Sequence, residues 1–192
     1  MVADRVLIMG PPGSGKGTQA ARICRRRGMA HISTGEILRQ AMAAGTELGE
    51  KVRAVVEKGN LVSDELMLDL VKERLEEDDC AGGFILDGYP RTVPQAASLL
   101  AMMNGCEAKL ETVLLLSVPH ETLVERLLGR GRSDDSRKTI EHRLEVYRNQ
   151  TEPVLEYLRR NGVVIDGVDG VGSVDEITER IERVLDAADK DL

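Results

Sequence analysis

Residues 10–19 read GPPGSGKGTQ and come directly after the apolar run VLIM at residues 6–9. In a glycine-rich turn of this kind, successive backbone N–H groups point inward at an anion, and the glycines allow positive φ and a close backbone approach. The helix that follows adds its positive N-terminal end, and Lys16 adds a full charge toward the β- and γ-phosphates. The stretch therefore predicts a strand, a phosphate-binding loop and a helix.

The loop departs from the usual pattern at one position. G-x-x-x-x-G-K-[ST] has a hydroxyl directly after the lysine, whereas here Gly17 takes that place and Thr18 follows. We expect Thr18 to approach the magnesium ion or the α-phosphate in a different way from the usual hydroxyl. The alternative, a chance glycine turn, is disfavoured by the preceding strand, the lysine and the helical continuation. The predicted phosphate-binding residues of the loop are Gly13, Ser14, Gly15, Lys16, Gly17 and Thr18.

Short apolar runs recur between helical stretches, at residues 5–9, 83–86, 112–118 and 163–165. Such nearly continuous runs are typical of strands that are buried on both faces of a parallel sheet. Their alternation with helices predicts an α/β fold with a doubly wound parallel sheet flanked by helices, similar to P-loop NTPases. In such a fold, ligands bind at the carboxyl ends of the strands.

Two helices can be outlined from the sequence. Residues 140–158 carry an apolar stripe at helical spacing, and Pro153 is expected to kink or split that helix. Ser173 followed by Glu176 resembles a capping box that opens a C-terminal helix.

Two segments fit the strand–helix alternation poorly. Residues 33–62 read as two short helical pieces, and residues 129–138, GRGRSDDSRK, have no apolar period. We interpret them as small mobile insertions that cover a site at the edge of the sheet. The chain of 192 residues is then a single domain with a core of residues 1–32, 63–128 and 139–192.

The formal net charge of −7 argues against a nucleic-acid partner or an anionic membrane surface. Residues 126–148 nevertheless form a basic island, which indicates either a bound small anion or a solvated helix face. The longest apolar runs have only strand length and no signal segment is visible, so we expect a cytoplasmic protein without a membrane span. The cysteines Cys24, Cys80 and Cys106 are far apart and lack C-x-x-C spacing, so neither a structural zinc nor a disulfide is expected.

Three further stretches identify a family. They are HISTGEILR at residues 31–39, NLV at residues 60–62 and DGYPRTVPQ at residues 87–95. With the phosphate loop, they strongly resemble the adenylate kinases over essentially the whole chain. The resemblance implies reversible transfer of the γ-phosphate of MgATP to AMP, giving two ADP. It thus implies ATP, AMP and ADP as small-molecule partners, Mg²⁺ as cofactor and a monomer.

Other functions fit the sequence less well. A UMP/CMP kinase, or another nucleoside monophosphate kinase on the same fold, is the nearest alternative, but Thr34 and Gln95 match the adenine version. A regulatory protein without turnover is disfavoured because Lys16, Asp87 and the arginines are present. A nucleic-acid-binding NTPase is disfavoured by the acidic charge and the scarcity of aromatic residues.

The chemistry of the acceptor stretch agrees with the resemblance. Asp87 follows the apolar residues 84–86, and a carboxylate at this position can hold magnesium through water, near Thr18. The alternative interpretation is that Asp87 is only a turn residue in an Asp-Gly pair. Arg39 and Arg91 suit the acceptor phosphate because guanidinium matches phosphate in bidentate geometry, although Arg39 alone could be a surface residue.

Base selection is expected to involve Gln95, whose amide suits the N6/N1 edge of adenine, and Thr34, which could instead cap a helix. By resemblance, the backbone of Asn60, Leu61 and Val62, together with Gly88, lines the AMP pocket. The resemblance also suggests a cis Tyr89–Pro90 peptide that aims Arg91 into the cleft.

Residues 125–135 and 141–144 resemble the lid of the short-lid adenylate kinases, because the long insertion with zinc-binding cysteines is absent. The resemblance places Arg126 and Arg130 on ATP, and Arg132 and Arg143 between the phosphates of donor and acceptor. It also places the backbone of Gly172 on the ATP adenine. Asp134 and Asp135 are expected to pair with arginines of the closed lid.

The acceptor's nucleophile is a phosphate oxygen that is already ionised, so no general base is required. His31, His120 and His142 are therefore expected to have no catalytic role. The predicted catalytic residues are Lys16, Asp87, Arg91, Arg126, Arg132 and Arg143.

Overall fold

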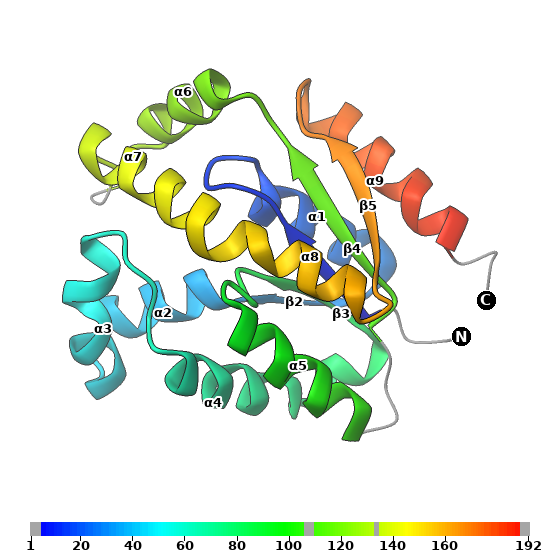
Figure 1. Ribbon diagram of the computed structural model, residues 1–192, viewed down its shortest axis with the longest axis horizontal. Helices are drawn as coiled ribbons and strands as arrows, with labels where there is room; N and C mark the ends of the chain where they lie inside the picture. The colour runs from blue at the N-terminus through cyan, green and yellow to red at the C-terminus, as the bar shows by residue number, and fades with distance from the viewer. Residues whose placement is uncertain (1–4, 106–109, 133–134, 189–192) are drawn as a thin grey trace.

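A parallel sheet forms the centre of the structure, a computed structural model that describes residues 5–105, 110–132 and 135–188 (Figure 1). Its five strands lie in the order β2-β3-β1-β4-β5. They are β1 (Arg5–Met9), β2 (Ala30–Ser33), β3 (Phe84–Asp87), β4 (Thr112–Ser117) and β5 (Val164–Asp169). The predicted doubly wound α/β fold is thus confirmed.

The strand order places a switch point next to β1. From β1 the chain first builds β2 and β3 on one side, and then crosses to β4 and β5 on the other side. Ile8 on β1 pairs with Asp87 on β3, and Asp87 also pairs with Ser33 on β2, so these strands end at the same level. A crevice at the carboxyl ends of the strands beside such a switch point is where doubly wound sheets bind ligands.

Helices cover both faces of the sheet. On one face, Val6 and Ile8 pack with Ile23 of α1 (Lys16–Arg27) and Ile181 of α9 (Val174–Ala188). On the opposite face, β1 contributes Leu7 and Met9 to a cluster that includes residues of α4 (Asp64–Leu75), α5 (Val93–Gly105) and α8 (Glu152–Arg160). Figure 1 shows α5 and α8 on the viewer's side of the sheet. Consecutive residues of a strand point to opposite faces, which is why continuous apolar runs are needed here.

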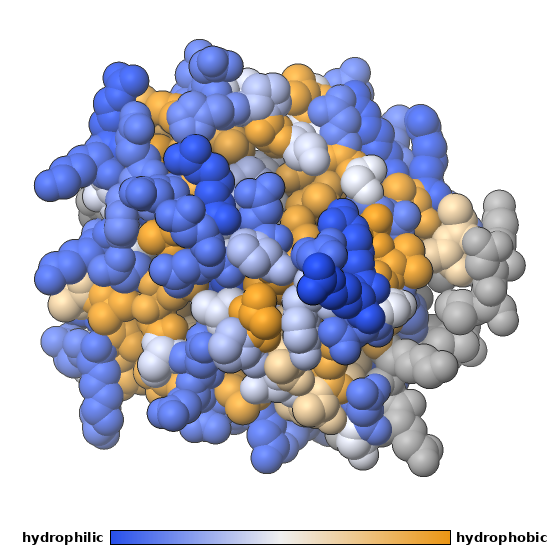
Figure 2. All heavy atoms as spheres, viewed as in Figure 1, coloured by the Kyte–Doolittle hydropathy of each residue, from blue (hydrophilic) through white to orange (hydrophobic). Residues whose placement is uncertain are grey.

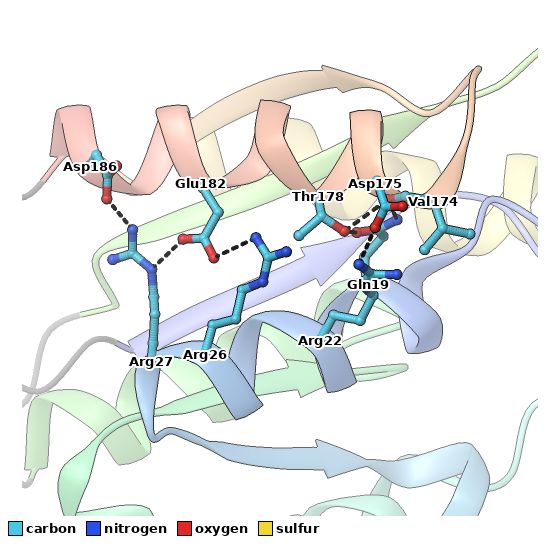
Figure 3. Close-up of polar contacts among 9 residues, drawn as sticks. All are labelled: Gln19, Arg22, Arg26, Arg27, Val174, Asp175, Thr178, Glu182 and Asp186. Atoms are coloured by element: carbon cyan, nitrogen blue, oxygen red, sulfur yellow. Dashed lines mark hydrogen bonds and ion pairs between the residues drawn. The ribbon is translucent and has the colours of Figure 1, made fainter.

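Polar contacts join α1 to α9 along their length (Figure 3). The ion pairs link Arg22, Arg26 and Arg27 on α1 to Asp175, Glu182 and Asp186 on α9. At the end nearest the phosphate loop, the buried amide of Gln19 donates to the carbonyl oxygen of Val174 at 3.0 Å and accepts from the Thr178 hydroxyl at 2.7 Å. The helix that begins in the phosphate loop is therefore fixed to the C-terminal helix.

Of the two segments expected as insertions, residues 33–62 are largely helical, whereas the described part of residues 129–138 is helical only at its ends. Residues 33–62 contain α2 (Thr34–Ala43) and α3 (Glu47–Glu57), which pack against each other, so the expectation of two short helical pieces is correct. The ends of residues 129–138 belong to α6 (His120–Arg130) and α7 (Arg137–Val146). These two helices share a small apolar cluster of Leu123, Leu127, Ile140 and Leu144. A 3₁₀ helix (Asp78–Gly82) precedes β3.

The strands differ from the sequence prediction in three places. The strand β2 was not predicted, because its four residues alternate buried Ala30 and Ile32 with the polar, half-buried His31 and Ser33 at the edge of the sheet. The strand β3 extends through Asp87, and β5 continues to Asp169 instead of ending at residue 165. An edge strand does not need apolar side chains on both faces, so apolar runs underestimate its length.

Both expectations for the helices are confirmed in substance. Pro153 lies on the second residue of α8, and a π-helical turn at Tyr147–Thr151 separates α8 from α7. Proline lacks the N–H and collides with the carbonyl group four residues earlier, so the hydrogen-bond ladder widens there. The capping box is present as well: Ser173 N–H donates to the Glu176 carboxylate at 2.7 Å, and Glu176 N–H donates to the Ser173 hydroxyl at 3.3 Å.

Within the described ranges, no helix combines the length and the apolar character needed to cross a bilayer. Hydrophilic side chains occupy much of the face shown in Figure 2, and hydrophobic ones appear between them in patches. Cys24 and Cys80 are buried, free thiols, whereas Cys106 lies outside the described residues.

Candidate active site

A cleft of about 940 Å³ lies where β1 and β3 end, and helices α2, α6 and α7 contribute to its walls. The residues predicted to bind nucleotide or to take part in catalysis line it, except Ser14 and Gly172. Among the described residues that line it, eight side chains are cationic and two are acidic, in a chain whose net charge is −7. The cationic ones are Lys16, Arg39, Arg74, Arg91, Arg126, Arg130, Arg132 and Arg143, and the acidic ones are Glu36 and Asp87.

The phosphate loop has the backbone that its glycines predict. Gly15 is the N-cap of α1 with φ 95°, and Gly10 has φ 144°. A Cβ on Gly10 would lie 2.6 Å from the carbonyl oxygen of Leu116, so a side chain there would displace β4. The loop is therefore held tightly against the sheet, and Ser14 is fully buried beneath it.

Lys16 bonds to its own loop. Its Nζ donates hydrogen bonds to the carbonyl oxygens of Gly10 at 2.6 Å and Pro11 at 2.9 Å. Although part of the side chain is open to the cleft, the surrounding protein lowers the pKa of Lys16 to about 8 through loss of hydration. The negative charge of Asp87 opposes this shift, and the positive charges of Arg91 and Arg130 add to it.

Asp87 is the last residue of β3 and is nearly buried. Its Oδ2 lies 3.4 Å from the Ser33 hydroxyl and 3.8 Å from Nε2 of His31. Burial works to raise the pKa of Asp87, but His31, Lys16 and Arg91 together hold it below its usual value. The carboxylate is therefore ionised at neutral pH, as a magnesium-binding group must be.

The position of Asp87 also explains the glycine after the lysine. A Cβ on Gly17 would lie 3.3 Å from Oδ2 of Asp87, so the carboxylate faces the residue that carries a hydroxyl in the usual loop. A carboxylate oxygen beside a phosphate cradle is the donor that Mg²⁺ prefers. The exposed Thr18 lines the same cleft. The residues present thus fit a magnesium ion bound together with nucleotide phosphates.

Residues of the segments 31–39 and 87–95 form the other end of the cleft. The Tyr89–Pro90 peptide is cis, as the resemblance to the adenylate kinases implied. The Nε of Arg91 donates to the carbonyl oxygen of Gly88 at 2.7 Å, and Arg39 on α2 pairs with Glu36 at 2.7 Å. Both guanidinium groups line the cleft.

Thr34 does not cap a helix. Ser33 is the N-cap of α2 and makes no side-chain cap hydrogen bond, while Thr34 is the first helical residue. The buried Thr34 hydroxyl instead donates to the carbonyl oxygen of Asp87 at 3.4 Å. The Thr34 side chain therefore belongs to the cleft wall, which was the other position expected for it.

The lid arginines are organised by one carboxylate. Asp135 accepts from Arg130 Nη2 and Nε at 2.7 and 2.8 Å, and its Oδ1 lies 3.3 Å from Nη1 of Arg143. The side chain of Asp135 is only 2% exposed. Burial works to raise the pKa of Asp135, but the hydrogen bonds and charge of Arg130 keep it below its usual value. The expected pairing of Asp135 with arginines is confirmed, and Asp134 lies outside the described residues.

Contacts also connect the lid to the rest of the cleft. Arg126 on α6 donates to the carbonyl oxygens of Ser14 at 3.5 Å and Gly170 at 3.0 Å. Arg143 on α7 donates to the carbonyl oxygen of Val56 at 3.3 Å. The helices α6 and α7 thus touch both the phosphate loop and the segment of residues 33–62.

Several residues near the site were not predicted. The buried Nε2 of His31 lies 3.8 Å from Oδ2 of Asp87 and makes no hydrogen bond to any described residue, whereas His142 makes a 2.7 Å hydrogen bond with the Asn60 side chain. Asp64 accepts from Gln95 at 2.8 Å. No local pattern points to these residues, because each depends on how distant segments pack.

The strand order, the glycine-rich loop at the switch point and the cationic cleft define a P-loop phosphotransferase. Comparison with known proteins narrows the class. The family model described as adenylate kinase matches residues 8–163. The chain belongs to the adenylate kinase family.

Individual relatives agree with this assignment. An adenylate kinase of Parasynechococcus marenigrum (strain WH8102) is 49% identical over 182 residues, which cover 95% of this chain and 98% of the relative. One from Stenotrophomonas maltophilia (strain R551-3) is 48% identical over 170 residues, covering 85% of this chain and 91% of the relative.

Proposed function

We propose that the chain transfers the terminal phosphoryl group of ATP, bound with Mg²⁺, to AMP and so interconverts ATP plus AMP with two ADP. The observation that carries this proposal is the continuity of the cleft. It runs from the phosphate loop at Lys16 to Arg91 and Gln95 at the other end, with Arg130, Arg132 and Arg143 on the lid side. One nucleotide can lie at each end with the phosphate tails meeting between them.

At the donor end, the backbone N–H groups of residues 13–18 and the N-terminus of α1 hold the ATP phosphates. Lys16 must leave the carbonyl oxygens of Gly10 and Pro11 to reach a phosphate oxygen. Arg126 and Arg130 contact ATP from α6, and the backbone at Gly172 contacts its adenine. Gly172 does not line the cleft, so this contact requires the 170–173 loop to meet the base outside it.

At the acceptor end, Arg39 and Arg91 bind the AMP phosphate in bidentate fashion. The Gln95 amide and Thr34 hydroxyl recognise the base, and Gly88, Tyr89 and Pro90 shape the pocket together with the backbone of residues 60–62. Gln95 is 2% exposed, so its amide is desolvated, and a mismatched base leaves the remaining N–H and oxygen lone pair of the amide without partners.

The transfer itself needs alignment and charge neutralisation. The acceptor oxygen is ionised at neutral pH, so no side chain has to remove a proton. Lys16, Arg132 and Arg143 neutralise the charge between the two phosphate tails and hold the reacting oxygens in line. Asp87, with Thr18 nearby, would hold a magnesium ion through water, and the ion would supply positive charge that offsets the negative charge of the phosphates.

Closure of the two insertions excludes water, which would otherwise compete as an acceptor. We therefore expect slow hydrolysis of ATP in the absence of AMP. We also expect an active cytoplasmic monomer.

The test is a coupled assay with MgATP and each of AMP, UMP, CMP and GMP as acceptor. We expect AMP to be preferred and ADP alone to be converted into AMP and ATP. A preference for UMP or CMP would replace the proposal with the pyrimidine kinase alternative. Rapid turnover of ATP without any acceptor would contradict it.

A further inference from the structure

The amide of Gln95 is held at both ends by other parts of the chain. Its Nε2 donates to Oδ1 of Asp64 at 2.8 Å, and its Oε1 accepts from the backbone N–H of Arg91 at 2.7 Å. The side chain is buried and lines the acceptor end of the cleft. Gln95 is on α5, whereas Asp64 is the first residue of α4.

These two partners fix which way the amide faces. A carboxylate can only accept hydrogen bonds and a backbone N–H can only donate them. If the amide turned over, its oxygen would face the Asp64 carboxylate and its N–H₂ would face the Arg91 N–H. One N–H and one oxygen lone pair of Gln95 remain, without another partner among the described side chains.

The direction of the amide matters because purines differ at this edge. Adenine presents an acceptor at N1 beside a donor at N6, whereas a 6-oxopurine such as hypoxanthine presents a donor at N1 beside an acceptor at O6. A glutamine amide matches either base in one of its two orientations and is mismatched in the other. An amide that could turn freely would therefore discriminate poorly between AMP and IMP.

Asp64 is itself held in place. The Thr92 hydroxyl donates to the same Oδ1 at 3.0 Å, and the first turn of α4 favours a negative charge. The Thr92 hydroxyl also accepts from the backbone N–H of Gln95 at 3.3 Å. The carboxylate, the hydroxyl and the amide thus form one connected group behind the base site.

We infer that Asp64 is a positioning residue that sets base selectivity, because it locks the Gln95 amide in the orientation that matches AMP and not IMP. This inference rests on the proposed function and on the base-reading role of Gln95. It adds a residue that need not touch the nucleotide.

The test compares kcat/KM for AMP and IMP with MgATP as donor. In Asp64→Asn the shape is kept, but residue 64 can now present either an oxygen or an N–H₂ to Gln95. We expect the AMP:IMP ratio of kcat/KM to fall about tenfold, which corresponds to about 1.4 kcal/mol. Glu65→Gln is the matched control, since it removes a charge from an exposed position of the same helical turn and should leave the ratio unchanged.

A second variant, Gln95→Leu, distinguishes a positioning role of Asp64 from a general loss of activity. In Gln95→Leu the ratio should already be low, and adding Asp64→Asn should not lower it further, because the two residues act as one unit. If Asp64→Asn does not fold, as judged by circular dichroism, Asp64→Ser is used with the same expectation.

The outcomes are distinct. A wild-type protein that does not phosphorylate AMP would overturn the proposed function itself. A wild-type protein that does so, with Asp64→Asn slowing AMP and IMP equally or leaving the ratio intact, would overturn the inference alone. A further fall of the ratio in the Gln95→Leu background would also overturn it.

Discussion

The ammonium group of Lys16 lies 2.6 Å from the carbonyl oxygen of Gly10, six residues earlier in the same phosphate loop. The cation thus donates hydrogen bonds to carbonyl oxygens of the loop, which phosphate oxygens would replace in the proposed ATP complex. Loss of hydration lowers the pKa of Lys16 to about 8, so the charge that we propose to bind ATP is itself sensitive to pH.

We predict that ATP affinity falls above pH 8 because Lys16 loses its proton. The cationic form is present below the pKa of about 8 and is lost above it, so the Kd for ATP should rise about tenfold per pH unit beyond that point. Lys16→Arg should bind ATP with no such slope, since guanidinium keeps its charge. Calorimetric titrations between about pH 7.5 and 9.5 measure both proteins, away from the phosphate ionisation near about pH 6. A flat wild-type profile, or an equal slope in Lys16→Arg, would contradict this prediction.

Asp135→Asn should destabilise the protein through its two arginines. The Asp135 carboxylate is buried against Arg130 and Arg143, and hydrogen bonds to charged groups contribute about 1.5–3 kcal/mol. We expect the free energy of unfolding in urea to fall by about this amount at pH 7. Because the folded-state pKa of Asp135 is lowered, the contribution is complete above about pH 5 and disappears as the pH falls below about 4.

Glu141→Gln on α7 is the control for this effect. The Arg137–Glu141 pair is 3.7 Å long and its side chains are 75% and 55% exposed, so its loss should change the free energy of unfolding by less than about 0.5 kcal/mol. Equal losses in the two variants, or a loss in Asp135→Asn that persists unchanged at pH 3, would show that the buried carboxylate is not the cause.

The sequence alone predicted those features whose chemistry and geometry both lie within one short segment. The loop around Lys16 is a contiguous motif whose glycines are needed by its own backbone, and the capping box of Ser173 and Glu176 spans a single helical turn. The buried strands β1 and β4 could be located because both of their faces require apolar side chains.

The sequence alone did not predict features that depend on contacts between distant segments. The strand β2 lies at the edge of the sheet and contains polar residues, so its sequence did not indicate a strand. The position of His31 beside Asp87 could therefore not be predicted either. The contact of Asp64 with Gln95 joins two helices that are 31 residues apart at this point. From the sequence, Thr34 could either cap a helix or line the acceptor pocket. The pairing of Ser33 with Asp87 between β2 and β3 places the Thr34 hydroxyl against the carbonyl oxygen of Asp87.

Gly88→Ala should impair the acceptor site more than it impairs folding elsewhere. Gly88 has φ 87°, and an added Cβ would lie 2.7 Å from the Thr34 hydroxyl and 3.1 Å from Nη2 of Arg91. Both side chains would have to move, so we expect the KM for AMP to rise at least about tenfold, equivalent to about 1.4 kcal/mol, in steady-state assays.

Gly162→Ala provides the comparison for the backbone effect. Gly162 has φ 78° with no atom within 4 Å of an added Cβ, so its substitution carries only the left-handed backbone cost of about 1–2 kcal/mol. The KM for AMP should stay unchanged in this variant. A similar rise in both variants would mean that loss of stability, and not the crowding of Thr34 and Arg91, raises the KM.

Thr178→Val should loosen the attachment of α1 to α9. The buried Thr178 hydroxyl donates to Oε1 of Gln19 at 2.7 Å, and valine leaves that oxygen buried without a donor (Figure 3). An unsatisfied buried group costs about 1–3 kcal/mol, and we expect the free energy of unfolding to fall by that amount in urea. Thr178→Ser keeps the hydroxyl and loses only a methyl group, so it should cost about 1 kcal/mol or less. If the serine variant is destabilised more than the valine variant, packing of the methyl group and not the hydrogen bond to Gln19 joins the two helices here.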